Sequence, residues 1–137
     1  MTKEKRRWVD SPQKPSAGQV PASLKAEVQR KAEQLIEETL KPRHLKPPPT
    51  DSDFNYIADI YTKWYRHYFF FCAKYCSPDP YAIAPDFETK FARLEYTGHN
   101  NLSLSFMRHT GEWIEIYSDL SVDQCLDAIR DDPLFQP

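Results

Sequence analysis

Strict alternation of apolar and polar residues in the C-terminal third is the feature that most constrains the fold. Every second position there is aliphatic or phenylalanine: Leu102, Leu104, Phe106, Ile114 and Ile116. Because successive side chains of a strand point to opposite faces of a sheet, each segment predicts a strand with one buried side. Pairing the aliphatic sets in one core predicts that Trp113 and Tyr117 lie together on the opposite face.

The segment from Phe54 to Tyr75 favours two further strands, because it is rich in aromatic and β-branched residues and contains no glycine or proline. We expect these strands at 54–65 and 68–76, with a turn at Arg66-His67, while a helix through this segment is the competing interpretation. The run Phe69-Phe70-Phe71 predicts a central strand covered on both faces. The remaining strands are expected at 87–96, 102–108 and 112–118, separated by short loops that contain Gly98 and Gly111.

Helical periodicity flanks this region on both sides. Apolar residues at i, i+4 and i+7 predict an amphipathic helix over 23–41, with Ser23 as its N-cap and Pro42 ending it. Ser121 followed by Gln124 matches a capping box and predicts a short helix over 121–132. The expected fold is therefore α+β, a five-stranded antiparallel meander sheet with the N-terminal and the short C-terminal helix on one face.

Residues 1–22 differ in composition from the rest of the chain. They carry five basic against two acidic residues, a local charge of +3, which leaves −5 for the remainder of a chain whose net charge is −2. Prolines at 12, 15 and 21 and few apolar side chains predict a flexible basic tail. The other residues, 23–137, are enough for one domain with a single core.

Composition also indicates the compartment. The longest apolar run, Tyr68 to Ala73, is far shorter than the roughly 20 residues of a membrane-spanning helix, so we expect no membrane span. The N-terminus lacks the apolar stretch of a secretory signal. Three cysteines cannot pair completely and fit reduced thiols. These features predict a cytoplasmic protein.

Candidate reactive groups do not form a recognisable motif. Cys72 and Cys76 lie four residues apart, a spacing that lacks the compact pairs typical of zinc sites. His67 near Cys72, or His109 near Ser105, is the arrangement that a nucleophilic enzyme would use. Four glutamates offer paired carboxylates, Glu88, Glu95, Glu112 and Glu115. With only three glycines in the chain, a phosphate-cradling loop is not expected. We predict no catalytic residue, metal or cofactor, and a small enzyme with a His/Cys or carboxylate site remains one alternative.

A second alternative is single-stranded nucleic acid binding. Aromatic side chains on an open sheet with nearby cations are the usual arrangement for stacking bases. Residues of this kind are Tyr61, Lys63, Tyr65, Arg66, Lys74, Arg93 and Arg108. The charge of −5 outside the tail opposes phosphate binding.

The order of elements resembles small bacterial domains of unknown function. The resemblance lies in the helix at 23–41, the connector Pro47-Pro48-Pro49, the last hairpin from Phe106 to Tyr117 and the acidic helix from Ser121 to Asp132. It covers residues 23–135. The resemblance implies neither an activity nor any site residue.

These features predict a non-enzymatic accessory or regulatory module that binds a larger protein complex. A basic tail and an aromatic sheet face are suited to docking on another protein. The residues expected to contact the partner are Arg6, Arg7, Trp8, Tyr61, Tyr65, Trp113 and Tyr117.

Overall fold

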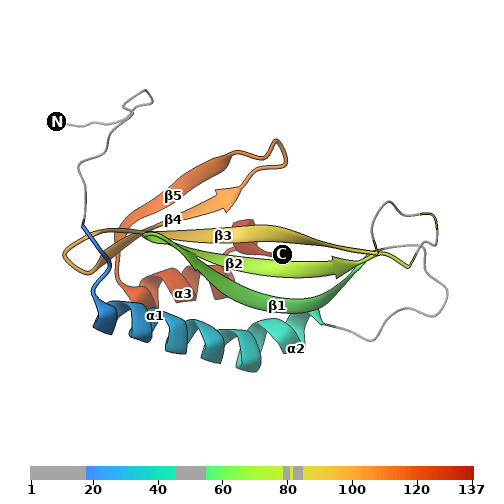
Figure 1. The fold of residues 1–137 in the computed structure, drawn as a ribbon, viewed down its shortest axis with the longest axis horizontal. Helices are drawn as coiled ribbons and strands as arrows, with labels where there is room; N and C mark the ends of the chain where they lie inside the picture. Colours follow the sequence, from blue (N-terminus) through green and yellow to red (C-terminus); the bar gives the residue numbers. More distant parts are fainter. Residues whose placement is uncertain (1–17, 46–54, 79–80, 82–84) are drawn as a thin grey trace.

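A computed structural model describes residues 18–45, 55–78, 81 and 85–137. Arg6, Arg7 and Trp8 lie outside the described residues. A five-stranded antiparallel sheet follows chain order and comprises β1 (Tyr56–Tyr65), β2 (Tyr68–Cys76), β3 (Asp86–Gly98), β4 (Asn101–Met107) and β5 (Trp113–Leu120). The helical elements are α1 (Ala22–Leu35), η2 (Ile36–Leu40), α2 (Lys41–His44), α3 (Val122–Asp131) and η3 (Pro133–Phe135). Both α1 and α3 lie below the same face of the sheet (Figure 1). The predicted α+β class and meander are confirmed.

The first helix forms because its apolar residues repeat every fourth position. Its buried side consists of Leu24, Val28, Ala32, Ile36 and Leu40, each at most 5% exposed. Two contacts join α1 to β1. Gln29 Nε2 donates a hydrogen bond to Thr62 Oγ1 at 3.2 Å, and Lys25 Nζ lies 5.2 Å from the centre of the Trp64 ring. This face of the sheet is the helix-covered face.

The predicted N-cap and the predicted C-terminal end of this helix were wrong. The N-cap is Pro21, which has no side-chain acceptor, rather than Ser23. At the other end the helix continues past Pro42 to His44 through the π-helical turn η2, in which the Lys41 amide donates to the carbonyl of Ile36. The wider π turn changes the hydrogen-bond pattern just before Pro42, which occupies the first turn of α2, where its missing N–H is tolerated.

The C-terminal helix begins as the sequence predicts. Ser121 Oγ accepts from the Gln124 amide at 3.2 Å, and Gln124 Oε1 accepts from the Ser121 amide at 2.9 Å. The buried side of α3 carries Val122, Cys125, Leu126 and Ile129. Lys31 Nζ binds Asp123 Oδ1 at 2.9 Å and so links α1 to α3. Among the described residues, the helices are too short or too polar to cross a lipid bilayer.

Strand pairing sets the two faces of the sheet. Phe69 pairs with Trp64 and Leu94, and Phe71 with Thr62 and Ala92, so these side chains share the helix-covered face. Phe69 and Phe71 are 1% and 0% exposed, whereas Phe70, which points to the opposite face, is only half-buried. The expectation that this strand is covered on both faces was therefore wrong at Phe70. Its position as an interior strand is correct.

The predicted common face of Trp113 and Tyr117 was also wrong. Trp113 pairs with Met107, and Ile114 with Phe106, as simple alternation requires. Irregularities in the β4–β5 pairing then leave Leu104 opposite Tyr117, which transfers Tyr117 to the helix-covered side. There Tyr117 Oη donates to Asp132 at 2.9 Å and its ring stands 6.3 Å from that of Phe135.

Replacing Ser121 with alanine tests the capping box. Loss of its side-chain acceptor leaves the Gln124 amide in the first turn of α3 unsatisfied, and we expect the free energy of unfolding to fall by about 1 kcal/mol. Urea denaturation followed by circular dichroism measures the change. Ser23→Ala is the matched control, since no side chain caps α1. Equal effects of the two substitutions would contradict this account of the helix start.

Candidate functional site

Four side chains form a cation and aromatic cluster on the face opposite the helices. The guanidinium of Arg93 lies 4.6 Å from the centre of the Tyr68 ring and 5.0 Å from that of Trp113. The rings of Phe70 and Trp113 stand 5.8 Å apart. Tyr68, Phe70, Arg93 and Trp113 are hereafter the open-face cluster. Because Arg93 stacks between two rings, the cluster holds its shape without a ligand.

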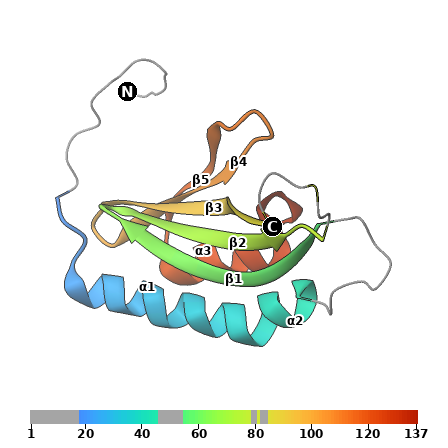
Figure 2. The same ribbon diagram turned by 45° about the vertical axis from the view of Figure 1, so that its right-hand side comes forward.

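Curvature of the sheet brings this cluster together. Phe70 lies on β2 and Trp113 on β5, so two strands separate them in the sheet order. Contact across that span requires the sheet to curl toward its open side, and β4 and β5 rise away from the plane of β1 to β3 in Figure 2. Pairing irregularities between β2 and β3 and between β4 and β5 favour this strong twist. The open face is consequently concave.

The concave face buries polar groups beside the cluster. Glu95, Ser103 and Ser105 are 5%, 1% and 1% exposed, although α1 and α3 lie on the other side of the sheet. Glu95 Oε2 lies 3.2 Å from Nε2 of His67, the second residue of the β1–β2 turn. The curl of the sheet therefore shields this side of the strands from water. The contact between His67 and Glu95 links the turn to β3.

Glu88 is the centre of a second polar group on the same face. Its carboxylate binds Lys63 Nζ at 2.7 Å and Lys90 Nζ at 3.2 Å, and it accepts a hydrogen bond from the hydroxyl of Tyr61. Lys63, the Tyr61 hydroxyl and Lys90 lower the pKa of Glu88 to about 2. Burial and the contact with Glu88 raise the pKa of Tyr61 above its ordinary value. Lys90 also stands 5.7 Å from the Phe70 ring, which joins this group to the open-face cluster.

The sequence-predicted contact residues separate in the structure. Trp113 belongs to the open-face cluster and Tyr61 to the Glu88 group, while Tyr65 at the turn is 57% exposed and lies 5.2 Å from the Arg66 guanidinium. Tyr117 lies on the other side of the sheet, as noted above. Sequence reasoning missed Tyr68 and Phe70 as contact residues. The pairing register across the predicted turn could have indicated them, because Tyr65 pairs with Tyr68 and Lys63 with Phe70, and paired residues share a face.

His67 and Cys72, which a nucleophilic enzyme would bring together, have different neighbours. His67 contacts Glu95, and Cys72 pairs across the strands with Tyr61 and Lys90. Burial raises the pKa of Cys72 to about 11 and that of Cys125 to about 12, so both thiols stay protonated near neutral pH. In the described part of the chain, no three His, Cys, Asp or Glu side chains gather as metal ligands would.

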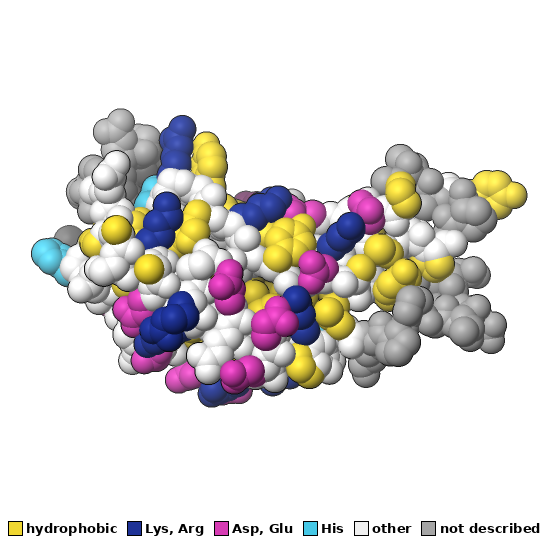
Figure 3. Space-filling view, turned by 60° about the horizontal axis from the view of Figure 1, so that its bottom comes forward, with side chains coloured by type: hydrophobic (Ala, Val, Ile, Leu, Met, Phe, Trp, Pro, Cys, Tyr) yellow, Lys and Arg dark blue, Asp and Glu magenta, His cyan; other side chains and the backbone are white. Residues whose placement is uncertain are grey.

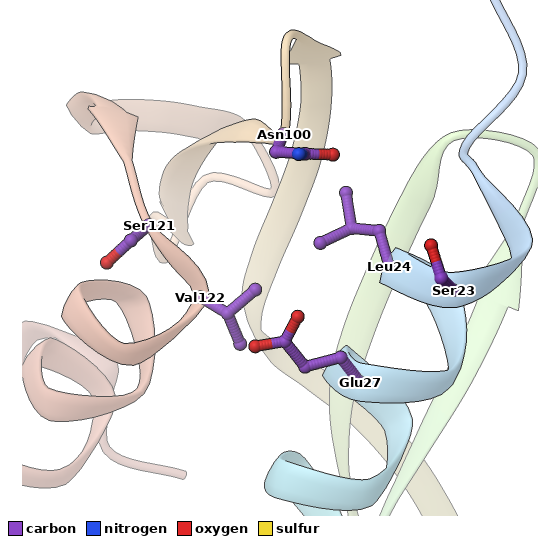
Figure 4. A pocket seen from close by; sticks show the side chains of 6 residues that line it. All are labelled: Ser23, Leu24, Glu27, Asn100, Ser121 and Val122. Carbon is purple, nitrogen blue, oxygen red and sulfur yellow. The ribbon is translucent and has the colours of Figure 1, made fainter.

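A small hollow of about 240 Å³ lies where the starts of α1 and α3 meet the β3–β4 turn. Figure 4 shows Leu24 and Val122 facing it, with the Glu27 carboxylate directed toward Val122 and Asn100 above. Glu27 already binds Lys31 at 2.9 Å. The hollow thus lies at the helix junction and brings only one carboxylate to its wall.

Charge on the helix side is mixed. Figure 3 shows Lys and Arg side chains interspersed with Asp and Glu across the surface that α1 forms. Ion pairs such as Lys41 Nζ with Glu37 at 2.7 Å join neighbouring turns of the helix. This side offers no field of one sign that would favour a charged partner.

Comparison with known proteins gives a family and nothing more specific. Residues 20–137 match the family model described as "Domain of unknown function (DUF3024)". No curated protein and no solved structure matches the chain. The match begins at residue 20, close to the predicted boundary between tail and domain, and it bears out the resemblance to domains of unknown function.

Replacing Glu88 with glutamine tests the second polar group. The pKa of Glu88 is depressed in the folded state, so its contribution is fully present above pH 4.5, the ordinary pKa, and is lost as the pH falls toward 2. We expect the wild type to exceed Glu88→Gln by about 1 kcal/mol in unfolding free energy at pH 6, and the two to converge near pH 2. Urea denaturation at several pH values measures the difference. Glu112→Gln, at a 68% exposed side chain, is the control. A constant difference across this pH range would refute the assignment.

Thiol reactivity tests the burial of the cysteines. Cys76 is half-buried whereas Cys72 and Cys125 are buried. We expect a colorimetric thiol reagent to modify one cysteine per folded chain at pH 7.5 and the other two only on unfolding. The rapid phase should disappear in Cys76→Ser. Rapid modification that persists in this variant would show that a buried thiol is accessible.

Proposed function

We propose that this chain, which belongs to the DUF3024 family, is a non-enzymatic protein-binding module that docks on a larger assembly through the open face of its sheet. One observation carries the proposal: the Arg93 guanidinium held between the rings of Tyr68 and Trp113. Tryptophan, tyrosine and arginine are the residues that most often dominate binding energy at protein interfaces. Here all three meet on one concave surface.

Order within the cluster supports a binding role. The stacked guanidinium and the Phe70–Trp113 contact already fix the side chains, so a partner would lose little affinity to ordering them. A concave sheet face also suits an extended segment, whose alternate side chains can enter the hollow. This arrangement favours a peptide or loop of a partner over a flat protein surface.

Charge at the edges of the face indicates the partner's composition. Arg66 lies in the β1–β2 turn, and Arg108, just after β4, makes one long ion pair of 4.0 Å, with Glu112, among the residues that the structure describes. Exposed cations flanking an apolar centre complement a segment with acidic residues on both sides of an apolar or aromatic one. We take such a segment as the proposed occupant.

The basic tail remains a second proposed contact. Arg6, Arg7 and Trp8 combine the residue types found at interface hot spots. We propose that the contribution of the tail to binding is separate from that of the open face. Deleting residues 1–17 separates this contribution from that of the sheet.

Single-stranded nucleic acid is the competing ligand. Lys63, Lys74 and Lys90 stand on the open face near aromatic rings, which favours it. However, Glu88 binds Lys63 and Lys90, and Asp86 lies 3.7 Å from Lys74. Phosphates would have to compete with these carboxylates, and for this reason we place the protein ligand first.

Selection from a random peptide library on the full chain tests the proposed occupant. We expect enriched peptides to carry acidic residues around an apolar or aromatic centre. Trp113→Ala should weaken such a peptide by about 2 kcal/mol, roughly 30-fold in Kd. Arg93→Lys keeps the charge but loses the planar stack, and a clear loss is expected there as well. Fluorescence anisotropy with purified variants measures both.

Tyr81→Ala is the matched control, because this aromatic is 92% exposed and lies in the connection between β2 and β3. It should bind the peptide as the wild type does. Equal affinity of Trp113→Ala and wild type for every enriched peptide would refute docking on the open face. A titration with a thymidine oligonucleotide at low salt runs beside it, and binding tighter than to any peptide would favour the nucleic-acid alternative.

A further inference from the structure

A second, larger cavity lies between the β1–β2 turn and the start of α1. It measures about 570 Å³, within the range of pockets that bind small molecules. The chain at Gly18, Gln19 and Val20 forms one wall together with Ala22, the first residue of α1. Three basic residues, Lys25, Arg66 and His67, form the rest.

The charge of this cavity is one-sided. No acidic residue belongs to its described lining. Lys25 and Arg66 make no ion pair with any described residue, and their contacts are with the ring faces of Trp64 and Tyr65, at 5.2 Å each. Elsewhere the lysines of the described surface are mostly paired, as Lys31, Lys41 and Lys63 are. Two unpaired cations beside one cavity attract a ligand with two negative charges.

The start of α1 adds to the same field. No acidic residue lies in its first turn, and its N-cap, Pro21, supplies no side-chain acceptor. The positive end of the helix therefore lacks the compensation that α3 receives from Ser121 and Asp123. The cavity and its cations define the site, and the helix end strengthens its preference for an anion.

We infer that this cavity binds a small phosphate ester. A phosphate monoester carries close to two negative charges near neutral pH, which matches the lysine and the arginine, and its oxygens fit the forked donors of a guanidinium. The cavity is larger than a phosphate group, and Val20, which packs against the core, provides an apolar wall for the organic part. A carboxylate would neutralise only one of the two cations.

Titration of the ¹⁵N-labelled full chain with phenyl phosphate tests this inference. We expect shifts of the amide signals of Lys25, Arg66 and His67, and tighter binding of phenyl phosphate than of inorganic phosphate or benzoate. Lys25→Gln and Arg66→Asn should each weaken phenyl phosphate by about tenfold, the effect of one charged hydrogen bond. Asparagine is chosen because Arg66 has a φ of 56°, which asparagine tolerates well.

Arg30→Gln removes one exposed charge from the same helix outside the cavity and should leave the affinity unchanged. Shifts absent from Lys25, Arg66 and His67 at saturating phenyl phosphate would overturn the inference. The inference would also be overturned if Lys25→Gln and Arg66→Asn weakened phenyl phosphate binding no more than Arg30→Gln does, because such losses would reflect net charge alone. Benzoate that binds as tightly as phenyl phosphate would overturn the choice of a phosphate ligand.

Discussion

Burial of one side of the sheet under α1 and α3 is the constraint on which the rest of the structure depends. Phenylalanine and leucine side chains from the three inner strands, together with Ile60 of β1, meet Leu24, Val28 and Ile129 there, and removing that surface from water is the main favourable contribution to folding. With its apolar residues committed to one side, each strand presents the intervening residues on the other. The open face is thus a consequence of the core, and its composition of rings, cations and carboxylates is free to serve binding.

Curling of the sheet gives that second face its character. A flat sheet would leave Phe70 and Trp113 too far apart to touch, and Ser103 and Ser105 would be open to water. Instead the last hairpin rises, the two rings meet at 5.8 Å and the serines become almost completely buried. Irregular pairing is the device that achieves this, since each extra residue increases local twist. The same irregularity sends Tyr117 to the helix side, so the curl that assembles Trp113 with Arg93 also divides the two aromatics of β5.

Local signals in the sequence were sufficient for the elements but not for the site. The capping box at Ser121 and Gln124 and the apolar residues at every fourth position of α1 act within one or two helical turns. The predicted strand limits were right to within about two residues. The π turn before Pro42 and the irregular pairing of β5 depend on packing between distant segments, which the sequence pattern does not contain. Phe70, Arg93 and Trp113 belong to three different strands. Only the cross-strand register, which the bulges shift, brings them together.

The β1–β2 turn connects the two proposed binding regions. His67 lies in the lining of the 570 Å³ cavity, its ring stands 4.2 Å from that of Tyr68, and its carbonyl accepts from the Tyr96 amide at 3.0 Å. Arg66 on one side of this residue faces the cavity, and Tyr68 on the other stacks on Arg93. A ligand that shifts Arg66 or His67 would therefore also shift Tyr68, one wall of the open-face cluster. Because a two-residue turn bonded to β3 has little freedom to move independently, we infer that a ligand in the cavity would affect docking on the open face through these three consecutive residues.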